Sequence, residues 1–288
     1  MDLLEGHERI KLVDMGFVSQ LPGGTISSAS APSACLPTGG RGSRVYLPPE
    51  VLSRFGVKRN MLNTATDVWA LACILIEFAL RMADLWNPDC RSEDQRMIWP
   101  TPGPVFESEF AFPLDHGQCD CNRRSLSEKV LDGLDDDWET KPLSVVVEQM
   151  SPEAKEILRR NADDDGEQLN IIFDLLGTPT ASETKHLDSI LQHYISLFVE
   201  RPSTLETVLK VCGDNFISLI KSALAFEPAK RSSIEEMIAH PYFDDVRHVR
   251  QPVPSDGSQV LLSDLRGADG ALDVEKIRTS MRGVMAAF

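Results

Sequence analysis

The first residues whose types and spacing suggest chemistry are Asp14, Met15 and Gly16, which follow an alternating stretch at residues 9–13. The alternation predicts a short strand that ends at the aspartate. A carboxylate at a strand end, followed by a glycine that permits positive φ, is a common way of directing an oxygen ligand at a metal ion. Asp14 is therefore a candidate metal ligand, and the same Asp-x-Gly pattern is also typical of a plain turn.

A second chemical feature is a stretch rich in hydroxyl groups at residues 18–42, where Gly, Ser, Pro and Thr dominate. This composition predicts a flexible surface loop. Accessible hydroxyls also make the loop a candidate for phosphorylation. The loop leads into the segment Ser43-Arg-Val-Tyr-Leu-Pro-Pro-Glu50.

A third group of candidate ligands is His116, Cys119 and Cys121. No second Cys/His pair lies at the spacing of a zinc finger, so we predict no structural zinc here. The cysteines are scattered without a disulfide framework, which indicates reduced intracellular thiols. There are six of them: Cys35, Cys73, Cys90, Cys119, Cys121 and Cys212.

The composition of the 288-residue chain limits what it can be. A hydrophobic content of 42% with 25% charged residues is typical of an ordinary globular protein. A net charge of −15 argues against a general nucleic-acid binder. No apolar stretch reaches the length of a membrane span and no secretion signal is evident, so we expect no membrane partner and a cytoplasmic or nuclear location.

The element that must position the candidate groups is an apolar stretch at residues 66–80. It is too long for a typical strand and too short to cross a bilayer, so it predicts a buried helix. Thr64 or Thr66 can cap the start, and Asp67 in the first turn suits the helix dipole. Large apolar residues occupy every face, which predicts that neighbours enclose the helix on all sides.

The order of these segments resembles the second half of a eukaryotic protein kinase. Asp14-Met-Gly resembles the metal-binding Asp-Phe-Gly motif, and Pro48-Pro49-Glu50 resembles Ala-Pro-Glu. Asp67-Val-Trp-Ala-Leu-Ala-Cys-Ile-Leu resembles the central helix of the kinase C-lobe. The resemblance implies that Asp14 binds Mg²⁺ with ATP and that Asp67 hydrogen-bonds the backbone of the catalytic loop.

Later segments narrow the resemblance to mitogen-activated protein kinases. Residues 167–180 look like the helix and Leu-Gly-Thr-Pro signature of the wider group, and residues 216–243 look like its closing helices. An amphipathic helix at residues 272–288 resembles the C-terminal extension of the mitogen-activated kinases. The resemblance also predicts a buried ion pair between Glu50 and Arg231.

Several family features are missing from these 288 residues. The sequence contains no Gly-rich loop, no phosphate-pairing strand lysine and no His-Arg-Asp catalytic loop, so we expect no catalytic residue in this chain and no activity from it alone. The helix that precedes the catalytic loop in the family is also missing. We therefore expect one face of Trp69 and its neighbours to be exposed, and a partner to cover it.

Regulation and substrate binding are implied at the end of the Ser/Thr-rich loop. The dual-phosphorylation Thr-x-Tyr of the family falls on Thr38-Gly-Gly40, so the threonine is kept and the tyrosine is lost. Ser43 falls where the family has a Thr or Ser that contacts the catalytic loop. Ser43 and Arg44 are expected to shape the substrate-binding floor, and the complete kinase would have an upstream kinase and protein substrates as partners.

Four regions follow from these comparisons of motifs. Residues 1–80 form the start of the C-lobe, 81–165 an acidic, partly disordered insertion, 166–245 the rest of the C-lobe, and 246–288 a C-terminal extension. Within the insertion we expect a solvated acidic surface at 132–139 and a helix at 151–160 that begins Ser-Pro-Glu. The predicted fold is mainly α, an incomplete kinase fold with one short strand at its start.

Two functions remain open on these grounds. The first is a fragment of a Ser/Thr protein kinase whose complete form transfers the γ-phosphate of ATP to protein hydroxyls, with Mg²⁺ and ATP as its cofactors. The second is a non-catalytic pseudokinase remnant that presents the C-lobe surface and the acidic insertion to other proteins.

Overall fold

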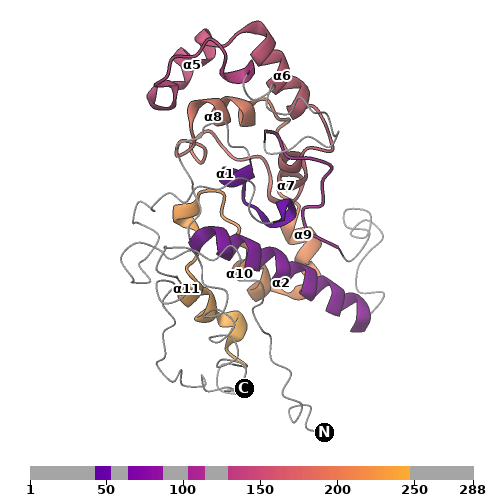
Figure 1. The fold of residues 1–288 in the computed structure, drawn as a ribbon. Coiled ribbons are helices and arrows are strands. Elements are labelled where there is room, and N and C mark those ends of the chain that lie inside the picture. Colours follow the sequence, from indigo (N-terminus) through magenta and orange to yellow (C-terminus); the bar gives the residue numbers. More distant parts are fainter. Residues whose placement is uncertain (1–42, 53–63, 87–102, 114–128, 247–288) are drawn as a thin grey trace, which may run out of the picture. The chain divides into compact units, whose positions relative to one another are not determined.

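A computed structural model of the protein describes residues 43–52, 64–86, 103–113 and 129–246 (Figure 1). The chain divides into two compact units, Met1–Phe243 and Asp244–Phe288. Of the second unit, residues 244–246 are described and exposed.

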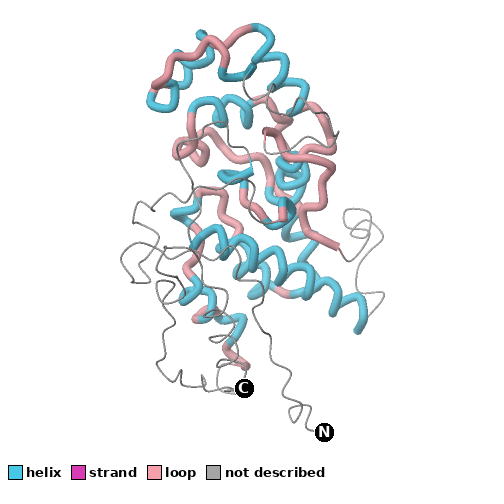
Figure 2. The backbone as a smooth tube through the Cα atoms, viewed as in Figure 1, coloured by secondary structure: helices cyan, strands magenta, loops and turns pink. Residues whose placement is uncertain are grey.

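The described part of the first unit is helical, as predicted (Figure 2). Its only extended pairing among the described residues is one isolated parallel bridge between Phe110 and Glu167. The strand expected at residues 9–13 lies outside the described part. The α-helices are α1 (Pro49–Leu52), α2 (Thr64–Trp86), α5 (Leu143–Gln149), α6 (Pro152–Ala162), α7 (Gln168–Leu176), α8 (Ser189–Ser196), α9 (Leu205–Leu209), α10 (Asp214–Ala223) and α11 (Ile234–Ile238). The 3-10 helices are η2 (Arg44–Tyr46), η3 (Trp138–Thr140), η4 (Lys210–Cys212), η5 (Pro228–Lys230) and η6 (Pro241–Phe243).

Helix α2 is longer than the sequence predicted. It runs for 23 residues, from Thr64 to Trp86, whereas the apolar stretch that predicted it covers residues 66–80, and the exposed Arg81 continues the helix. Thr64 is its first helical residue, so neither Thr64 nor Thr66 is the N-cap, contrary to our expectation. Asp67 does lie in the first turn, where its charge suits the helix dipole.

One face of α2 is exposed, and the expectation that neighbours enclose it on all sides is wrong. Ile74, Phe78 and Met82 are 40%, 65% and 43% exposed. These residues are four positions apart, so they form one stripe along the helix. The opposite side contributes buried residues to the core: Val68, Trp69, Ala72, Cys73, Ile76 and Leu80.

Trp69 is fully buried, so the prediction that this tryptophan would lose its cover is also wrong. Its ring stacks on Phe106 with the centroids 5.7 Å apart. The guanidinium of Arg231 lies 4.9 Å from the centroid of the same ring. Both covering groups come from parts of the chain that sequence periodicity could not place. At 3.6 residues per turn, the exposed stripe lies about 140–180° around α2 from Trp69, on the opposite side of the helix.

The described residues between 103 and 165 share the core of α2. Helices α5 and α6 pack on α8, and α10 packs on α2 (Figure 1). Val146 of α5 and Leu158 of α6 are fully buried. The carboxylates of the acidic run 132–139 lie largely at the surface, while Trp138 within it is only 8% exposed and packs into the core.

Helix α6 confirms the expected helix that follows Ser151. The Ser151 hydroxyl accepts a hydrogen bond from the amide of Ala154 at 3.0 Å, and Pro152 occupies the first helical position. This is the arrangement that favours a helix start, since a serine oxygen satisfies an unpaired amide and proline has none to satisfy.

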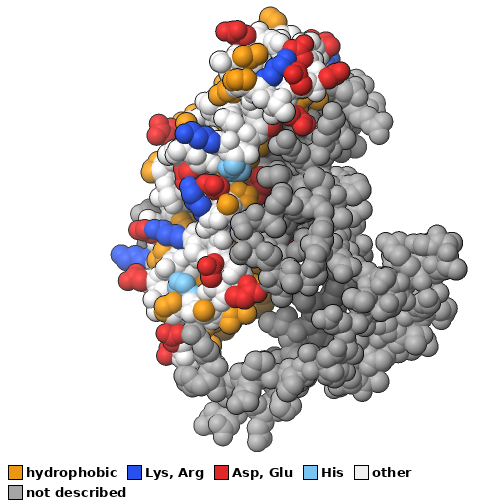
Figure 3. Space-filling model, turned by 90° about the vertical axis from the view of Figure 1, so that its left-hand side faces the viewer, with side chains coloured by type: hydrophobic (Ala, Val, Ile, Leu, Met, Phe, Trp, Pro, Cys, Tyr) orange, Lys and Arg blue, Asp and Glu red, His pale blue; other side chains and the backbone are white. Residues whose placement is uncertain are grey.

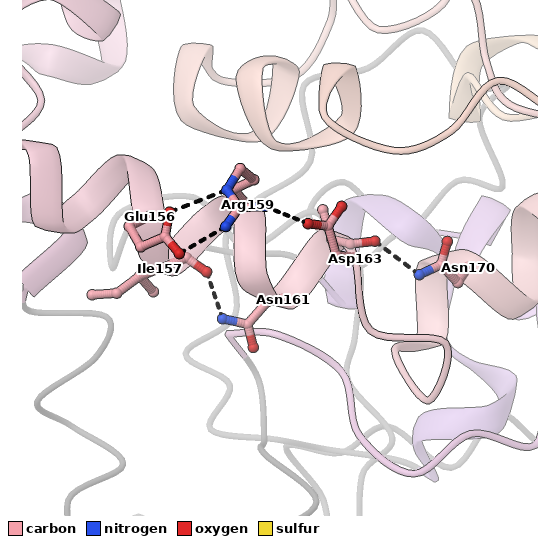
Figure 4. Close-up of polar contacts among 7 residues, drawn as sticks. Glu156, Ile157, Arg159, Asn161, Asp163 and Asn170 are labelled. Carbon is pink, nitrogen blue, oxygen red and sulfur yellow. Dashed lines mark hydrogen bonds and ion pairs between the residues drawn. The ribbon is translucent and has the colours of Figure 1, made fainter.

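The end of α6 is joined to α7 by polar contacts (Figure 4). Arg159 bridges Glu156 and Asp163, with both N–O distances at 2.8 Å. Asn170, which is buried in α7, donates to the carbonyl of Asp164 at 2.8 Å. The exposed ion pairs contribute little stability, whereas the buried amide fixes the turn that leads into α7.

Two glycines with the same backbone conformation give a matched test of packing. Gly177 ends α7 with φ +84° and ψ 157°, and Gly213 precedes α10 with φ +84° and ψ 161°. Only glycine adopts this region readily, and other residues there are strained by about 1–3 kcal/mol. A Cβ on Gly177 would lie 2.9 Å from the backbone nitrogen of Ser203, while a Cβ on Gly213 would meet nothing within 4 Å.

We therefore expect Gly177→Ala to destabilise the protein more than Gly213→Ala does, by at least about 1 kcal/mol. Both variants carry the same backbone strain, so their difference isolates the clash with Ser203. Urea unfolding of the two variants measures it. Equal losses of stability in the two variants would contradict the packing at Gly177.

Candidate functional site

The segment at residues 43–52 passes from the surface into the core. Ser43 is exposed and precedes η2, whose turn is closed by a hydrogen bond from the Tyr46 amide to the Ser43 carbonyl at 3.0 Å. Leu47 is buried, and α1 continues the burial through Glu50 and Leu52. This segment therefore presents its first residues to solvent and anchors its last ones.

The anchor is a buried ion pair between Glu50 and Arg231, as the resemblance predicted. Nη1 and Nη2 of the arginine contact the two carboxylate oxygens at 2.7 and 2.8 Å. The two side chains are 1% and 0% exposed. A bidentate contact of this kind is among the strongest that a protein forms between side chains.

The remaining donors of Arg231 bind backbone carbonyls. Nε donates to Ala225 at 2.8 Å, Nη1 to Ala65 at 3.2 Å and Nη2 to Phe226 at 3.2 Å. All five N–H groups of the guanidinium therefore have a partner, which offsets the penalty of burying its charge. One side chain thus joins α1, the start of α2 and the turn after α10.

Arg44, at the exposed end of the segment, is tied to α7 through residues 103–113. Its Nη2 donates to the carbonyl of Ser108 at 2.5 Å. The Ser108 hydroxyl donates to the side chain of Gln168, whose Nε2 in turn donates to the carbonyl of Phe106 at 2.8 Å. The sequence did not connect these two residues, because Ser108 belongs to no motif and lies 60 positions from Gln168, which belongs to the motif at residues 167–180.

Glu77 of α2 binds both residues 43–52 and residues 103–113. Its carboxylate accepts from the Val105 amide at 3.1 Å and from the Tyr46 hydroxyl at 3.3 Å. Partial burial raises the pKa of Glu77, and these two hydrogen bonds partly oppose the rise. The only signal in the sequence was a charged residue within an apolar helix, and such a residue needs a polar partner when it is half-buried.

Glu167 holds residues 103–113 against the start of α7. Its fully buried carboxylate accepts from the Leu169 amide at 2.5 Å, as the N-cap of α7, and from the Phe112 amide at 3.2 Å. Burial raises the pKa of Glu167 to about 8, although the backbone amides favour the charged form. The sequence placed this glutamate at a helix start but gave no indication that it is buried.

The other predicted site residues are only partly placed. Asp67 is exposed at the start of α2, and partial burial of the carboxyl raises its pKa. Asp14 and Thr38 lie outside the described residues, as do His116, Cys119 and Cys121. The structure therefore pairs Glu50 with Arg231, ties Arg44 to Ser108, and does not place the candidate metal ligand.

Two features are absent from the described residues. Within residues 43–52, 64–86, 103–113 and 129–246, no three His, Cys, Asp or Glu side chains lie together where they could hold a metal ion. In the same part of the chain, no helix is both long and apolar enough to span a membrane.

Comparisons with known proteins identify the family. The family model described as the protein kinase domain matches residues 3–243. Mitogen-activated protein kinase spm1 of Schizosaccharomyces pombe is 36% identical over 77 residues, which cover 26% of this chain and 18% of the relative. Mitogen-activated protein kinase PMK11 of Pyricularia oryzae is 32% identical over 96 residues, which cover 31% of this chain and 27% of the relative.

A serine/threonine-protein kinase with a different name is also similar. The probable serine/threonine-protein kinase glkA of Dictyostelium discoideum is 31% identical over 80 residues, covering 28% of this chain and 17% of the relative. The matches span 13% to 27% of the length of the curated relatives. The helical fold, the Glu50–Arg231 anchor and these matches agree, and the chain belongs to the protein kinase family as a C-terminal lobe similar to that of the mitogen-activated protein kinases.

Proposed function

We propose that the chain is the C-lobe part of a Ser/Thr protein kinase that transfers the γ-phosphate of ATP to hydroxyl groups of other proteins. The observation that carries the proposal is the closed Glu50–Arg231 ion pair. It fixes the inner end of residues 43–52, so that Ser43 and Arg44 are held at the outer end as the floor beneath a substrate protein. Phosphoryl transfer depends on such positioning together with electrostatic stabilisation.

The roles of the other site residues follow from the family. Asp14 would hold Mg²⁺, and Mg²⁺-ATP would supply the phosphoryl group. Thr38 and Ser43 would be the regulatory hydroxyls of the segment, with Thr38 or a nearby serine phosphorylated by an upstream kinase. Asp67 would bind the backbone of the catalytic loop from the start of α2. A protein with these partners would work in the cytoplasm or the nucleus.

We further propose that the 288 residues do not transfer phosphate by themselves. Transfer needs a base, a phosphate-pairing lysine and two metal ligands, and of these only Asp14 has a counterpart in the printed sequence. The activity would then belong to a longer protein of which these residues are the C-lobe.

The test is a phosphorylation assay on two preparations, one of the 288-residue chain and one of the protein isolated from its natural source with an antibody against residues 272–288. With radiolabelled ATP and myelin basic protein, the natural protein should label the acceptor and the 288-residue chain should not. Introducing Asp14→Asn into the natural gene should lower labelling by at least about 10²-fold, since it removes a metal ligand. Asp132→Asn, in the acidic run, is the matched control and should retain full labelling.

Either of two results would contradict the kinase proposal. In the first, the Asp14→Asn protein labels the acceptor as well as the natural protein does. In the second, an immunoblot shows that the natural protein is no larger than these 288 residues. The second result would favour the alternative, a non-catalytic pseudokinase remnant that binds other proteins. A specific observation supports that alternative as well, namely the exposed stripe of Ile74, Phe78 and Met82 on α2. Exposed apolar side chains in a row mark surfaces that associate with something else.

We propose that a partner covers this stripe, whether that partner is the rest of a kinase or a separate protein. Phe78→Glu should then reduce self-association of the 288-residue chain, measured by light scattering against concentration. Val199→Glu is the control, because Val199 is also 65% exposed but lies outside α2. The stripe would not be an association surface if the two variants scattered light equally.

A further inference from the structure

Helix α2 carries opposite charges on either side of the centre of its exposed face. Asp67 lies in the first turn and Arg81 near the other end, and both residues are exposed. Ile74 stands midway between them, seven positions from each. Seven residues fall within about 20° of two full turns of an α-helix, so these three residues form one row. Phe78, which is 65% exposed, lies about 40° around the helix from Ile74, on the same face.

The two charges of this row are not paired within the described part of the chain. There, neither Asp67 nor Arg81 forms an ion pair with another described residue. Partial burial raises the pKa of Asp67, which is the shift expected of a carboxylate that loses water without gaining a cation. The exposed face of α2 is therefore negative at one end, apolar in the middle and positive at the other end.

A face with this order of properties is complementary to a reversed copy of itself. In a two-fold contact between antiparallel helices, a residue that precedes the centre by a given number of positions faces the residue that follows the centre by the same number. With Ile74 at the centre, Asp67 of each copy faces Arg81 of the other copy. The contact then contains two identical ion pairs with apolar side chains between them.

The apolar side chains also fit in this register. Phe78 faces Ala70 of the second copy, and Ala70 is small and half-buried, so it leaves room for the ring. The two Ile74 side chains meet at the two-fold axis. A contact centred on Phe78 would instead place Arg81 opposite an apolar residue. Charge and side-chain size therefore both favour the register centred on Ile74.

The charge of the whole chain does not favour self-association by itself. With a net charge of −15, two copies repel each other over long range. On the face drawn in Figure 3, acidic and basic side chains are interspersed over the described surface, so no large patch of one sign there attracts a second copy. Association must then depend on a local match of opposite charges and apolar side chains, which the exposed face of α2 supplies.

We propose that the 288-residue chain forms a two-fold dimer in which the exposed faces of two α2 helices pack antiparallel around Ile74. The inference rests on the proposal that a partner covers the exposed stripe, and it identifies that partner as a second copy of the chain. An interface built mainly on one helix face is small, so the dimer is weak and its population depends on concentration. A catalytic loop bound to Asp67 would exclude this dimer.

Reversing one charge at a time tests the register. Sedimentation velocity across a concentration series gives the dissociation constant of the dimer. Asp67→Arg places like charges opposite each other at both ends of the contact and should weaken the dimer at least about tenfold, and Arg81→Asp should do the same. Asp67→Arg is the sharper of the two tests, because it also reduces the net negative charge. A general relief of repulsion would strengthen association, which is the opposite of the expected result.

Two combinations should restore the dimer. In an equimolar mixture of the Asp67→Arg and Arg81→Asp proteins, each copy again faces opposite charges on the other, and the double variant Asp67→Arg/Arg81→Asp restores both pairs within one protein. Restoration also shows that both single variants are folded. Asp214→Arg, in the exposed first turn of α10, and Arg160→Asp, in the exposed last turn of α6, make the same charge changes elsewhere and should leave the dissociation constant unchanged.

Three results would overturn the inference. One is a chain that stays monomeric throughout the concentration series. Another is single variants that dimerise as well as the natural sequence, as they would in a parallel contact, where identical residues face each other. The third is a mixture of the weakened variants that does not recover.

The outcome of this test is distinguishable from that of the earlier proposals. If Phe78→Glu abolished association and the charge reversals did not change it, this inference would be wrong while the stripe remained an association surface. None of these results bears on Asp14→Asn in the phosphorylation assay, which tests the kinase proposal separately.

Discussion

Arg231→Ala is expected to lower the free energy of unfolding by about 3–5 kcal/mol, because it leaves the Glu50 carboxylate buried without its cation. The same change removes the donors to Ala65, Ala225 and Phe226 and one cover of the Trp69 ring. A loss of this size is a large share of the net stability of an ordinary domain. Urea unfolding measures this loss, and the slope of the free energy of unfolding against urea concentration should stay unchanged.

Two further variants separate the charge from the geometry. Arg231→Lys keeps the charge but cannot make the bidentate contact or reach the three carbonyls, so most of the loss should remain. Lys230→Ala is the matched control, since the neighbouring lysine pairs with Glu227 at the surface with 63% of its side chain exposed. Its removal should change stability by no more than about 1 kcal/mol. An Arg231→Ala protein as stable as the Lys230→Ala protein would refute the anchoring role of the pair.

Glu167→Gln is expected to change how stability depends on pH. In the folded protein burial raises the pKa of Glu167 to about 8, whereas the carboxyl of the unfolded chain has its ordinary value near 4.5. Between these two values the folded state holds a proton that the unfolded state has released. The contribution of Glu167 is therefore fully present below pH 4.5 and is lost as the pH rises towards 8.

The glutamine variant lacks this titration, so the wild type should lose stability relative to Glu167→Gln as the pH rises. Between pH 6 and pH 8 the relative loss should be about 2–3 kcal/mol, at about 1.4 kcal/mol per pH unit. Urea unfolding of both proteins at the two pH values measures the change. Comparing proteins at each pH removes the contributions of other groups, among them Asp188, whose pKa burial raises to about 6.

A surface carboxylate provides the control for this second prediction. Glu153, at the exposed start of α6, pairs with Lys129 with 62% of its side chain exposed. Glu153→Gln should differ from the wild type by the same small amount at pH 6 and pH 8. If Glu167→Gln behaved in the same way as Glu153→Gln, the carboxyl of Glu167 would not be buried at the start of α7 as the structure describes.

Much of the fold could be predicted from local signals. The segment Ser151-Pro152-Glu153 predicted the start of α6. Glu167 and Gly177 lie at the two ends of α7, within the motif that predicted a helix there. A serine oxygen or a glycine at a helix end acts on backbone groups within a few residues, so the sequence nearby contains all the information. The order of motifs likewise predicted the mainly helical kinase fold and the Glu50–Arg231 pair.

The exposed stripe of α2 and the buried state of Trp69 could not be predicted in this way. The hydrophobic residues of α2 cover its whole circumference, so periodicity did not say which side the neighbours occupy. Phe106 and Arg231 determine that the Trp69 side of α2 is the buried side, and both contact Trp69 from distant parts of the chain. The end of the predicted helix was also placed too early, because Arg81 lies on the exposed face and the helix continues through it.

The sequence by itself determined the family, the helical class, the start of α6 and the residues of the anchor. The tertiary structure decided which face of α2 is open, and that Glu77 and Gln168 connect residues 43–52 to the rest of the lobe. The physical reason is the distance along the chain over which each interaction acts. Caps and turns join residues within a few positions, whereas Glu50 and Arg231 are 181 positions apart and the contacts around them form only when the whole lobe has folded.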